Sequence, residues 1–262
     1  MKFKMYQVDA FTDKLFAGNP AAVVILESSL SENVMQSIAS ENNLSETAFV
    51  SIHENPVSIR WFTPSIEVDL CGHATLASAR ILFDHYPNLA GEEINFDSKS
   101  GTLKVTKCND GHCLNFPADQ PIENELDSLF IEILDIEPLM LLRGKDDYLA
   151  VFKNQKQIED MQPKLSLLKK INARGLVISA PGDEVDFVSR CFYPEAGIEE
   201  DPVTGSAHTM LTPYWANEFN KEDLEGHQLS RRGGKLNCRL ANDRVYISGN
   251  SVIYFEGTIS IV

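Results

Sequence analysis

The sequence lacks the signature motifs of several large enzyme classes. It contains no GxGxxG, no P-loop and no Gly-x-Ser-x-Gly. These motifs supply the dinucleotide loop, the phosphate cradle and the nucleophile elbow of many redox, phosphoryl-transfer and hydrolytic enzymes. Their absence gives no support to those three readings.

Long apolar runs are also missing. No stretch approaches the ~20 apolar residues that cross a bilayer. Two early lysines, Lys2 and Lys4, are followed by no apolar run of signal length. The sequence therefore predicts neither a membrane span nor a secretory signal, and we expect a cytoplasmic protein.

Positive charge is scarce, and cysteines are few. Lys and Arg number 23 against 38 Asp and Glu, which gives a formal net charge of −15. Such a field repels phosphate backbones and anionic lipid, so we expect neither nucleic acid nor a membrane surface as a partner. An anionic substrate then needs a local positive site. The five cysteines are odd in number and scattered, which is typical of reduced thiols rather than a disulfide framework.

The two halves of the sequence share one pattern. Arg-x-Phe-x-Pro occurs at residues 60–64 and again at residues 190–194, and the two phenylalanines are 130 positions apart. Each copy is followed by an acidic loop and a Gly-x-Ala turn into a helical segment. Similar order and near half-length spacing indicate a duplication. We predict two similar halves, residues 1–118 and 119–262, joined by an exposed linker at 117–125; whether the C-terminal strand returns to the first half is left open.

Alternating and β-rich segments dominate the chain, with helical patterns between them. This mixture predicts an α/β (α+β) fold. Helices are expected at 31–42, 72–86, 127–134 and from 205 onward. Strands are expected at 3–11, 21–25, 47–52, 57–62, 102–106, 113–116, 148–152, 176–179, 186–192, 235–240, 244–248 and 252–259.

The two Gly-x-Ala turns are candidate binding sites. Gly72 and Gly205 each precede a helix, whose first N–H groups point outward with the positive end of the helix dipole. Facing each other across a cleft between the halves, two such helix starts would hold carboxylate groups. His73 lies in the first turn of its helix, where a neutral imidazole is favoured. Asp201 and Ser206 lie around the second turn.

Cys71 and Glu46 are less certain from their surroundings. A thiol just before a helix, such as Cys71, can serve as a nucleophile or carbon base, but it can also be a small buried apolar side chain. The matching position is Thr204, so a symmetrical pair of thiols is absent. Composition and spacing alone describe Glu46 as a solvated loop carboxylate.

Two further segments resemble sites without their full set of parts. CNDGHC at 108–113 offers possible zinc ligands, but Asn-Asp-Gly between strands is typical of a hairpin, and no second ligand pair follows. We predict no metal there. The basic segment 230–235 is interpreted as a solvated loop that could border an anionic site.

Five blocks resemble the PhzF-like family, the phenazine-biosynthesis isomerase-like proteins. They are VDAFT (8–12), GNPAAV (18–23), NLSETAF (43–49), CGHAT (71–75) and DPVTGSA (201–207), and the stretch 228–234 is also similar.

The resemblance implies a diaminopimelate-epimerase-like fold, in which two pseudo-symmetric halves each curl a mostly antiparallel sheet around a central helix. It also implies no cofactor and a homodimer. In the phenazine enzyme, a glutamate of the Leu-Ser-Glu-Thr block moves a proton between carbons of a dihydro-hydroxyanthranilate. Glu46 matches that residue. The remaining site residues that the resemblance implies are Asp201 and His73 as catalytic partners, with Asn19, Gly72, Gly205 and Ser206 binding substrate.

Three functions stay open at this point. The first is a cofactor-independent isomerase that moves a proton on a small carboxylate-bearing molecule, with Glu46 as acid and base. The second is an amino- or imino-acid epimerase, racemase or dehydratase that depends on Cys71. The third is a non-catalytic protein that binds a small ligand. The substrate itself is not indicated, since family membership does not fix it.

Overall fold

The chain forms two units in the computed structural model, which describes residues 1–54 and 56–261. Unit 1 comprises residues 1–115 and the chain from Ser248 onward; unit 2 comprises residues 116–247. The sequence places the division at 118/119 and leaves open whether the C-terminal strand returns to the first half. In the structure the last strand belongs to unit 1, because it is hydrogen-bonded along the first strand.

Unit 1 is a sheet with two helices. Its strands are β1 (Lys2–Ala10), β2 (Asn19–Leu26), β3 (Glu46–Ser51), β4 (Ser58–Phe62), β5 (Glu67–Val68), β6 (Glu93–Ser98), β7 (Gly101–Cys108), β8 (Gly111–Pro117, which runs into unit 2) and β18 (Ser251–Ser260); its helices are α1 (Glu32–Asn42) and α2 (Gly72–His85).

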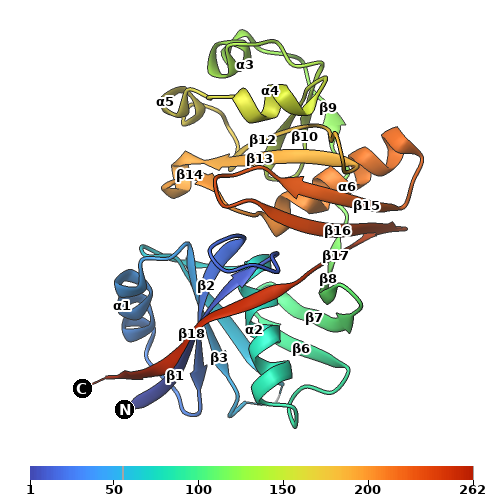
Figure 1. The fold of residues 1–262 in the computed structure, drawn as a ribbon. Helices are drawn as coiled ribbons and strands as arrows, with labels where there is room; N and C mark the ends of the chain where they lie inside the picture. Colours follow the sequence, from blue (N-terminus) through green and yellow to red (C-terminus); the bar gives the residue numbers. More distant parts are fainter. Residues whose placement is uncertain (55, 262) are drawn as a thin grey trace. The chain divides into compact units, whose positions relative to one another are not determined.

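The strands of unit 1 pair in a fixed sequence of directions. β18 and β1 are antiparallel, as are β1 and β2, while β2 and β3 are parallel. β3 and β4 are antiparallel, and β4 then pairs with β5 antiparallel and with β6 in parallel. The hairpins β6–β7 and β7–β8 complete the sheet. Figure 1 shows β18, in red, beside β1, in blue.

Unit 2 contains the remaining elements. Its strands are β9 (Ile122–Glu123), β10 (Met140–Arg143), β11 (Asp147–Val151), β12 (Gly175–Pro181), β13 (Phe187–Tyr193), β14 (Ile198–Asp201), β15 (Asp223–Gln228), β16 (Gly234–Ala241) and β17 (Arg244–Gly249, whose end reaches unit 1); its helices are α3 (Ser128–Leu134), α4 (Gln155–Asp160), α5 (Leu165–Leu168), the 3₁₀ turn η1 (Pro194–Ala196) and α6 (Gly205–Phe219).

Unit 2 repeats the strand pairing of unit 1. β9–β10 and β10–β11 are antiparallel, β11–β12 is parallel, and β12–β13 is antiparallel. β13 then pairs with β14 antiparallel and with β15 in parallel, and β15–β16 is antiparallel. The order and direction match β18–β1–β2–β3–β4–(β5)–β6–β7 element by element. The two units therefore have the same strand topology.

The repeated Arg-x-Phe motif occupies equivalent places in the two sheets. Phe62 lies opposite Thr47 in the β3–β4 pair, and Phe192 lies opposite Leu176 in the β12–β13 pair. The preceding arginines also match. Arg60 binds Glu67 and lies 5.2 Å from the ring centre of Phe62, while Arg190 binds Glu200 and lies 5.1 Å from that of Phe192. The registers show that the sequence repeat is a structural repeat.

A central helix fills each curled sheet. In α2, eleven of fourteen residues are buried, and the helix contacts β1, β2 and β3 (Figure 1). In α6, nine of fifteen residues are buried, and the helix contacts β15 and β16. A helix that is buried on all sides has apolar residues around its whole circumference. The outer faces are covered instead by α1 in unit 1 and by α3, α4 and α5 in unit 2.

α6 contains a proline in its interior, and the carbonyl that loses its helical donor has another partner. Pro213 has no N–H to give to the carbonyl of Thr209, four residues earlier. That carbonyl accepts a hydrogen bond from the backbone N–H of Asp119 instead, at 3.0 Å. The proline therefore ties the central helix of unit 2 to the segment that enters the unit.

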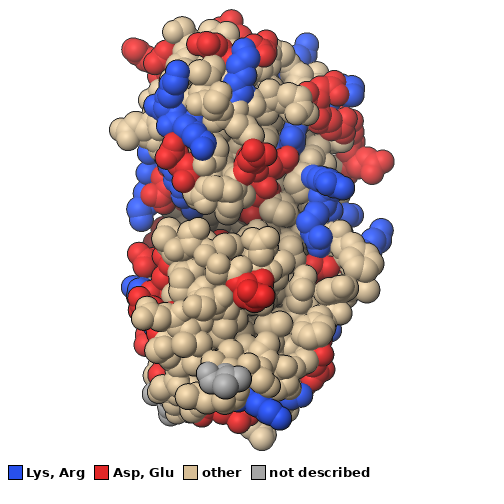
Figure 2. Space-filling model, turned by 90° about the vertical axis from the view of Figure 1, so that its left-hand side faces the viewer, with Lys and Arg blue, Asp and Glu red and all other residues tan. Residues whose placement is uncertain are grey.

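Acidic and basic side chains are interspersed on the face drawn in Figure 2, although the net charge is −15. Across residues 1–54 and 56–261, the model contains no helix with the length and apolar character of a membrane span.

Several short elements were not predicted. β6, β10 and β15, with α4 and α5, lie in stretches that the sequence leaves unassigned. The expected linker at 117–125 also contains a short strand, β9, which pairs with β10. The predicted hairpin at 108–113 is confirmed, since Cys108 lies opposite Gly111 in the β7–β8 pair.

Candidate functional site

Unit 1 brings four of the predicted site residues together. Asn19 begins β2 and Glu46 begins β3; these strands are parallel, so their first residues lie at the same edge of the sheet. Cys71 is the N-cap of α2, and His73 is its second residue. Asn19 and His73 are fully or almost fully buried, Cys71 is buried, and the Glu46 side chain keeps 13% of its surface exposed.

His73 is the centre of this group. Its Nδ1 lies 3.2 Å from the amide Nδ2 of Asn19 and 3.6 Å from the thiol sulfur of Cys71. Its Nε2 lies 3.2 Å from Oε2 of Glu46. The imidazole therefore separates the thiol from the carboxylate and contacts both.

The protonation of His73 follows from its burial and neighbours. Burial lowers the pKa of His73 to about 3, so the ring is neutral near pH 7. A neutral imidazole carries one N–H. Because the Asn19 amide nitrogen can only donate, Nδ1 is the accepting nitrogen, and the ring proton resides on Nε2. Nε2 lies close to the Glu46 carboxylate, but the two groups do not form a hydrogen bond in this structure.

Glu46, Cys71 and His73 also carry the atom types that bind metal ions. Ligand-type atoms of Glu46, Cys71 and His73 lie within 4.8 Å of one another. However, the thiol approaches Nδ1 and the carboxylate approaches Nε2. Contacts with different ring nitrogens are typical of a chain of polar contacts, whereas zinc ligands converge on one point at about 2.0–2.3 Å. The arrangement does not fit a metal centre.

Unit 2 builds a different group at the equivalent helix start. Asp201 ends β14 and is 7% exposed; its Oδ2 accepts a hydrogen bond from the hydroxyl of Thr204, the N-cap of α6. Gln228 is fully buried and spans both residues: its Oε1 accepts from the Thr204 N–H at 2.8 Å, and its Nε2 donates to the Asp201 carbonyl at 2.7 Å. The Asp201–Thr204 turn is therefore held rigidly ahead of Gly205.

Ser206, the second residue of α6, contacts a charged group that the sequence did not indicate. Nη2 of Arg174 donates to the Ser206 hydroxyl oxygen at 3.1 Å. The same guanidinium binds Asp147 through two nitrogens, with the Nε–Oδ1 distance at 2.9 Å, and its carbon lies 5.0 Å from the ring centre of Tyr193. Tyr193 also donates to Asp147 at 3.4 Å.

The strand registers give the counterpart of each group. Glu46 lies opposite Ala21 in the β2–β3 pair, and Gly175 lies opposite Asp147 in the equivalent β11–β12 pair. Gly175 therefore occupies in unit 2 the position of Glu46. A Cβ on Gly175 would overlap the ring of Tyr193 and the carbonyl of Phe192, so no side chain fits there. Unit 2 has no base at this position.

The basic segment at 230–235 lies next to Asp201. The hydroxyl of Ser230 donates to the carbonyl of Pro202 at 2.7 Å and accepts from the N–H of Gly233 at 3.0 Å. This loop is therefore packed against the turn that precedes α6, as expected for a segment bordering that turn.

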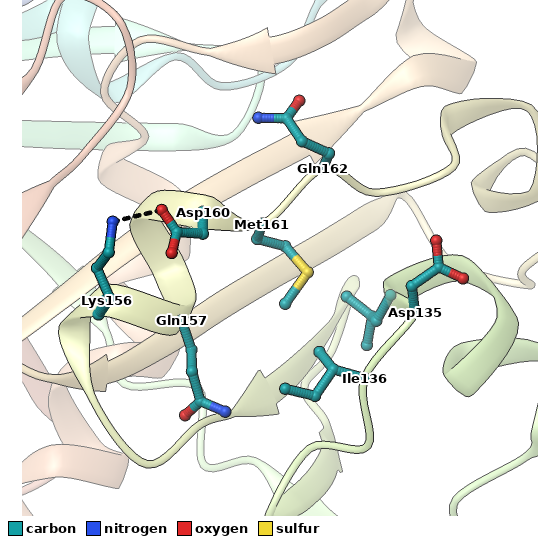
Figure 3. A pocket seen from close by; sticks show the side chains of 8 residues that line it. Asp135, Ile136, Lys156, Gln157, Asp160, Met161 and Gln162 are labelled. Carbon is teal, nitrogen blue, oxygen red and sulfur yellow. Dashed lines mark hydrogen bonds and ion pairs between the residues drawn. The ribbon is translucent and has the colours of Figure 1, made fainter.

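A pocket of unit 2 contains none of the predicted site residues. It has a volume of about 360 Å³ and lies between α3 and α4. Figure 3 shows Lys156 bound to Asp160 and the side chain of Met161 directed toward Ile136. Its charged side chains are all in ion pairs, Lys156 with Asp160 and Asp135 with Lys164, so we assign no catalytic group to it.

Sequence reasoning did not identify Arg174 or Asp147 as site residues, and it gave Gln228 only as part of a similar stretch. Arg174 and Asp147 are 27 positions apart and meet only because β11 and β12 are parallel neighbours. No local pattern marks them.

Comparisons with known proteins agree with this fold. The family model described as phenazine biosynthesis-like protein (PhzC-PhzF) matches residues 8–257. An uncharacterized isomerase of Halalkalibacterium halodurans is 46% identical over 255 residues, covering 96% of each chain, and another of Pseudomonas aeruginosa is 44% identical over the full length of both.

Solved structures show the same relationship. A PhzF-family phenazine biosynthesis protein of Enterococcus faecalis superposes with a TM-score of 0.96 at 43% identity and covers all of both chains. A predicted epimerase of Pseudomonas aeruginosa, 19% identical over 99% of this chain and all of its own, has a TM-score of 0.74, which shows a shared fold. The chain belongs to the phenazine biosynthesis-like (PhzC-PhzF) family.

Proposed function

We propose that this isomerase moves a proton between two carbons of a small carboxylate-bearing substrate, and that Glu46 is the acid and base that carries it. The observation that supports this most directly is the contact of 3.2 Å between Glu46 Oε2 and Nε2 of a neutral, buried His73. A general base needs a fixed position near the proton that it removes.

The surroundings of Glu46 suit repeated proton transfer. His73 lies beside the carboxylate, with Nε2 3.2 Å from Oε2, while Asn19 fixes the ring from the other side. His73 itself is a poor proton carrier near pH 7, because protonating a buried imidazole is unfavourable.

The reaction needs no other reactant. Glu46 takes a proton from a carbon next to a carboxylate-conjugated system, and the electron pair of that C–H bond moves into the conjugated system. The protonated Glu46 then returns the proton to another carbon, which restores the carboxylate. Substrate and product have the same composition, as isomerisation requires.

The groups of unit 2 are proposed to bind the same substrate. Asp201 offers a buried carboxylate for an amino or hydroxyl group. Ser206 and the first N–H groups of α6 suit a carboxylate, since a helix N-terminus stabilises negative charge. That the active site lies between the halves stays a prediction.

The alternative in which Cys71 is the base is less well supported. Cysteine acts as a nucleophile or base in its thiolate form. Its neighbour His73 resists accepting the thiol proton, since burial lowers the pKa of the imidazole to about 3. The equivalent position in unit 2 is Thr204, whose hydroxyl is bound to Asp201. We assign Cys71 to the support of His73.

Cofactor independence and a homodimer remain proposals that derive from the family resemblance. The relatives named isomerases argue against a purely ligand-binding role. Activity that survives dialysis against a chelator would support cofactor independence, and light scattering on the purified protein gives the oligomeric state.

Deuterium exchange tests the assignment of the base. The protein is incubated in D₂O with a dihydro-hydroxyanthranilate and with related cyclic dienyl carboxylates, and incorporation is followed by mass spectrometry. Glu46→Gln keeps the shape of the side chain but removes the base, so exchange should fall by roughly 10²–10⁴-fold. Cys71→Ala should retain most of it, and the surface variant Glu93→Gln serves as control. Wild-type exchange in Glu46→Gln together with its loss in Cys71→Ala would assign the chemistry to the thiol.

A further inference from the structure

We propose that Arg174 is a positioning residue, which fixes the hydroxyl of Ser206 so that its proton points away from the guanidinium and toward bound substrate. This inference rests on the proposed function, because it takes Ser206 as a substrate-binding group. It adds a residue that neither the sequence pattern nor the family blocks contain.

The direction of the hydroxyl proton follows from the donor that binds its oxygen. A guanidinium has only donors, and Nη2 of Arg174 lies 3.1 Å from the Ser206 oxygen. The serine hydroxyl must therefore accept from Arg174. Its own proton then points elsewhere, where it is available to an acceptor such as a carboxylate oxygen.

Arg174 is itself held in place. Asp147, with 4% of its side chain exposed, binds the guanidinium through two nitrogens, and the ring of Tyr193 lies against it. An arginine fork on a carboxylate has a defined plane and orientation. These contacts hold the guanidinium without a ligand. The rest of the Arg174 side chain remains accessible, with 41% of its surface exposed. A charge anchored on its buried side and exposed beside Ser206 is suited to acting on that hydroxyl.

The duplication shows that this contact is a counterpart of the Glu46–His73 contact. His73 and Ser206 are each the second residue of a central helix. In unit 1 that residue contacts Glu46, the first residue of β3; in unit 2 it contacts Arg174, directly before the first residue of β12. Arg174 is one residue before Gly175, the equivalent of Glu46, so neighbouring positions at the start of this strand carry an anion in unit 1 and a cation in unit 2. Unit 2 is thereby suited to the anionic part of the substrate.

Benzoate binding tests the inference without requiring the natural substrate. Amide shifts of Gly205 and Ser206 are followed in ¹⁵N-labelled protein during titration with benzoate, and benzamide is the uncharged control. Arg174→Gln should weaken benzoate binding about tenfold or more, and Ser206→Ala should do the same. The double variant should bind no more weakly than either single variant, because Arg174 and Ser206 act through the same hydrogen bond and their effects do not add.

Two controls separate recognition from folding. Arg174→Gln is also made together with Asp147→Asn, so that no unpaired carboxylate is buried. Arg239→Gln removes the same charge from a surface pair with Asp223 and should leave binding unchanged. Thermal unfolding of each variant confirms the fold.

Three outcomes would overturn the inference. They are unchanged binding in Arg174→Gln, an additional tenfold loss when Arg174→Gln is made in the Ser206→Ala protein, and no benzoate shift at Gly205 or Ser206 in the wild type. None of them bears on proton exchange by Glu46, which is measured separately.

Discussion

The two units share one strand order and differ at the few positions that carry chemistry. Unit 1 has a carboxylate and an imidazole at the edge where its parallel strands begin. At the equivalent edge of unit 2 the carboxylate position is Gly175, and the helix residue is a serine bound by arginine. The difference teaches that a duplicated fold can keep its strand order and pairing while the side chains at equivalent helix starts diverge, and under the proposed function this divergence separates the base from the binding groups.

Making unit 1 resemble unit 2 at the base should have the largest effect. Glu46→Gly introduces the residue that unit 2 has there, and proton exchange should fall by about 10²–10⁴-fold because the base is gone. The removed side chain leaves space, so added formate or acetate should restore part of the activity. Exchange is measured in D₂O as described above. Undiminished exchange in Glu46→Gly would show that the asymmetry at this position has no catalytic meaning.

The repeated arginines allow the stability of the two units to be compared. Arg190 binds Glu200 and also donates to the carbonyls of Ile158 and Met161, with 10% of its side chain exposed. Arg190→Met should cost about 3–5 kcal/mol, because it leaves a partly buried carboxylate and two carbonyls without their donor.

Arg60→Met is the matched variant in unit 1. Glu67 keeps Lys99 as a second cation, and Arg60 is 29% exposed, so the cost should be smaller, about 1–2 kcal/mol. Urea unfolding of both variants gives the two values. Equal costs would mean that the extra carbonyl contacts of Arg190 contribute nothing measurable.

Gly175 should resist any side chain. Gly175→Ala places a Cβ against the ring of Tyr193 and the carbonyl of Phe192, and should destabilise the protein by about 1–3 kcal/mol. Gly91→Ala is the control, since an added Cβ there meets nothing within 4 Å; it should change stability by less than about 0.5 kcal/mol. Differential scanning calorimetry compares them. A harmless Gly175→Ala would remove the steric reason for the missing base in unit 2.

Each central helix contains a buried neutral histidine, and the one in unit 2 gives the smallest predicted effect. Burial lowers the pKa of His208 to about 4, below the ordinary 6.5. As the pH falls below 6.5, the unfolded chain binds a proton that the folded protein refuses, so stability is complete above pH 6.5 and falls toward pH 4. Between pH 8 and pH 6 this costs about 1 kcal/mol.

His208→Asn tests this contribution. Asparagine can still donate to the carbonyl of Thr204, which His208 contacts through Nδ1 at 2.8 Å, but it does not titrate. The variant should therefore lose about 1 kcal/mol less than the wild type between pH 8 and pH 6 in urea unfolding. An unchanged pH dependence would assign the loss to other groups.

The parts of the fold that the sequence predicts are those with short, repeated patterns. The Arg-x-Phe strands, the two Gly-x-Ala helix starts and the hairpin at 108–113 are each defined by neighbours in sequence. β10 and β15 were missed because their strand pattern is weak. β10 has only four residues, and β15 is rich in polar residues and contains Gly226, where a side chain would overlap Phe187. Long-range pairing, which local propensity does not describe, places them in the sheet.

The candidate site was predictable to a similar degree. His73 and Cys71 follow from the helix start, but Glu46 stands out only through the family resemblance, since its role depends on a helix 26 residues further along the chain. Arg174 was not predictable because its partners, Asp147 and Ser206, reach it from a neighbouring strand and from α6. Contacts between residues so far apart in the chain leave no pattern in the local sequence.

The return of β18 to unit 1 has a consequence for synthesis on the ribosome. Unit 2 is one continuous segment, whereas unit 1 needs both residues 1–115 and the strand made after unit 2. The edge of β1 that binds β18 therefore stays unpaired while about 130 residues are translated, and exposed strand edges promote association between chains. Unit 1 is therefore the first part of the protein to emerge and the last to complete its sheet.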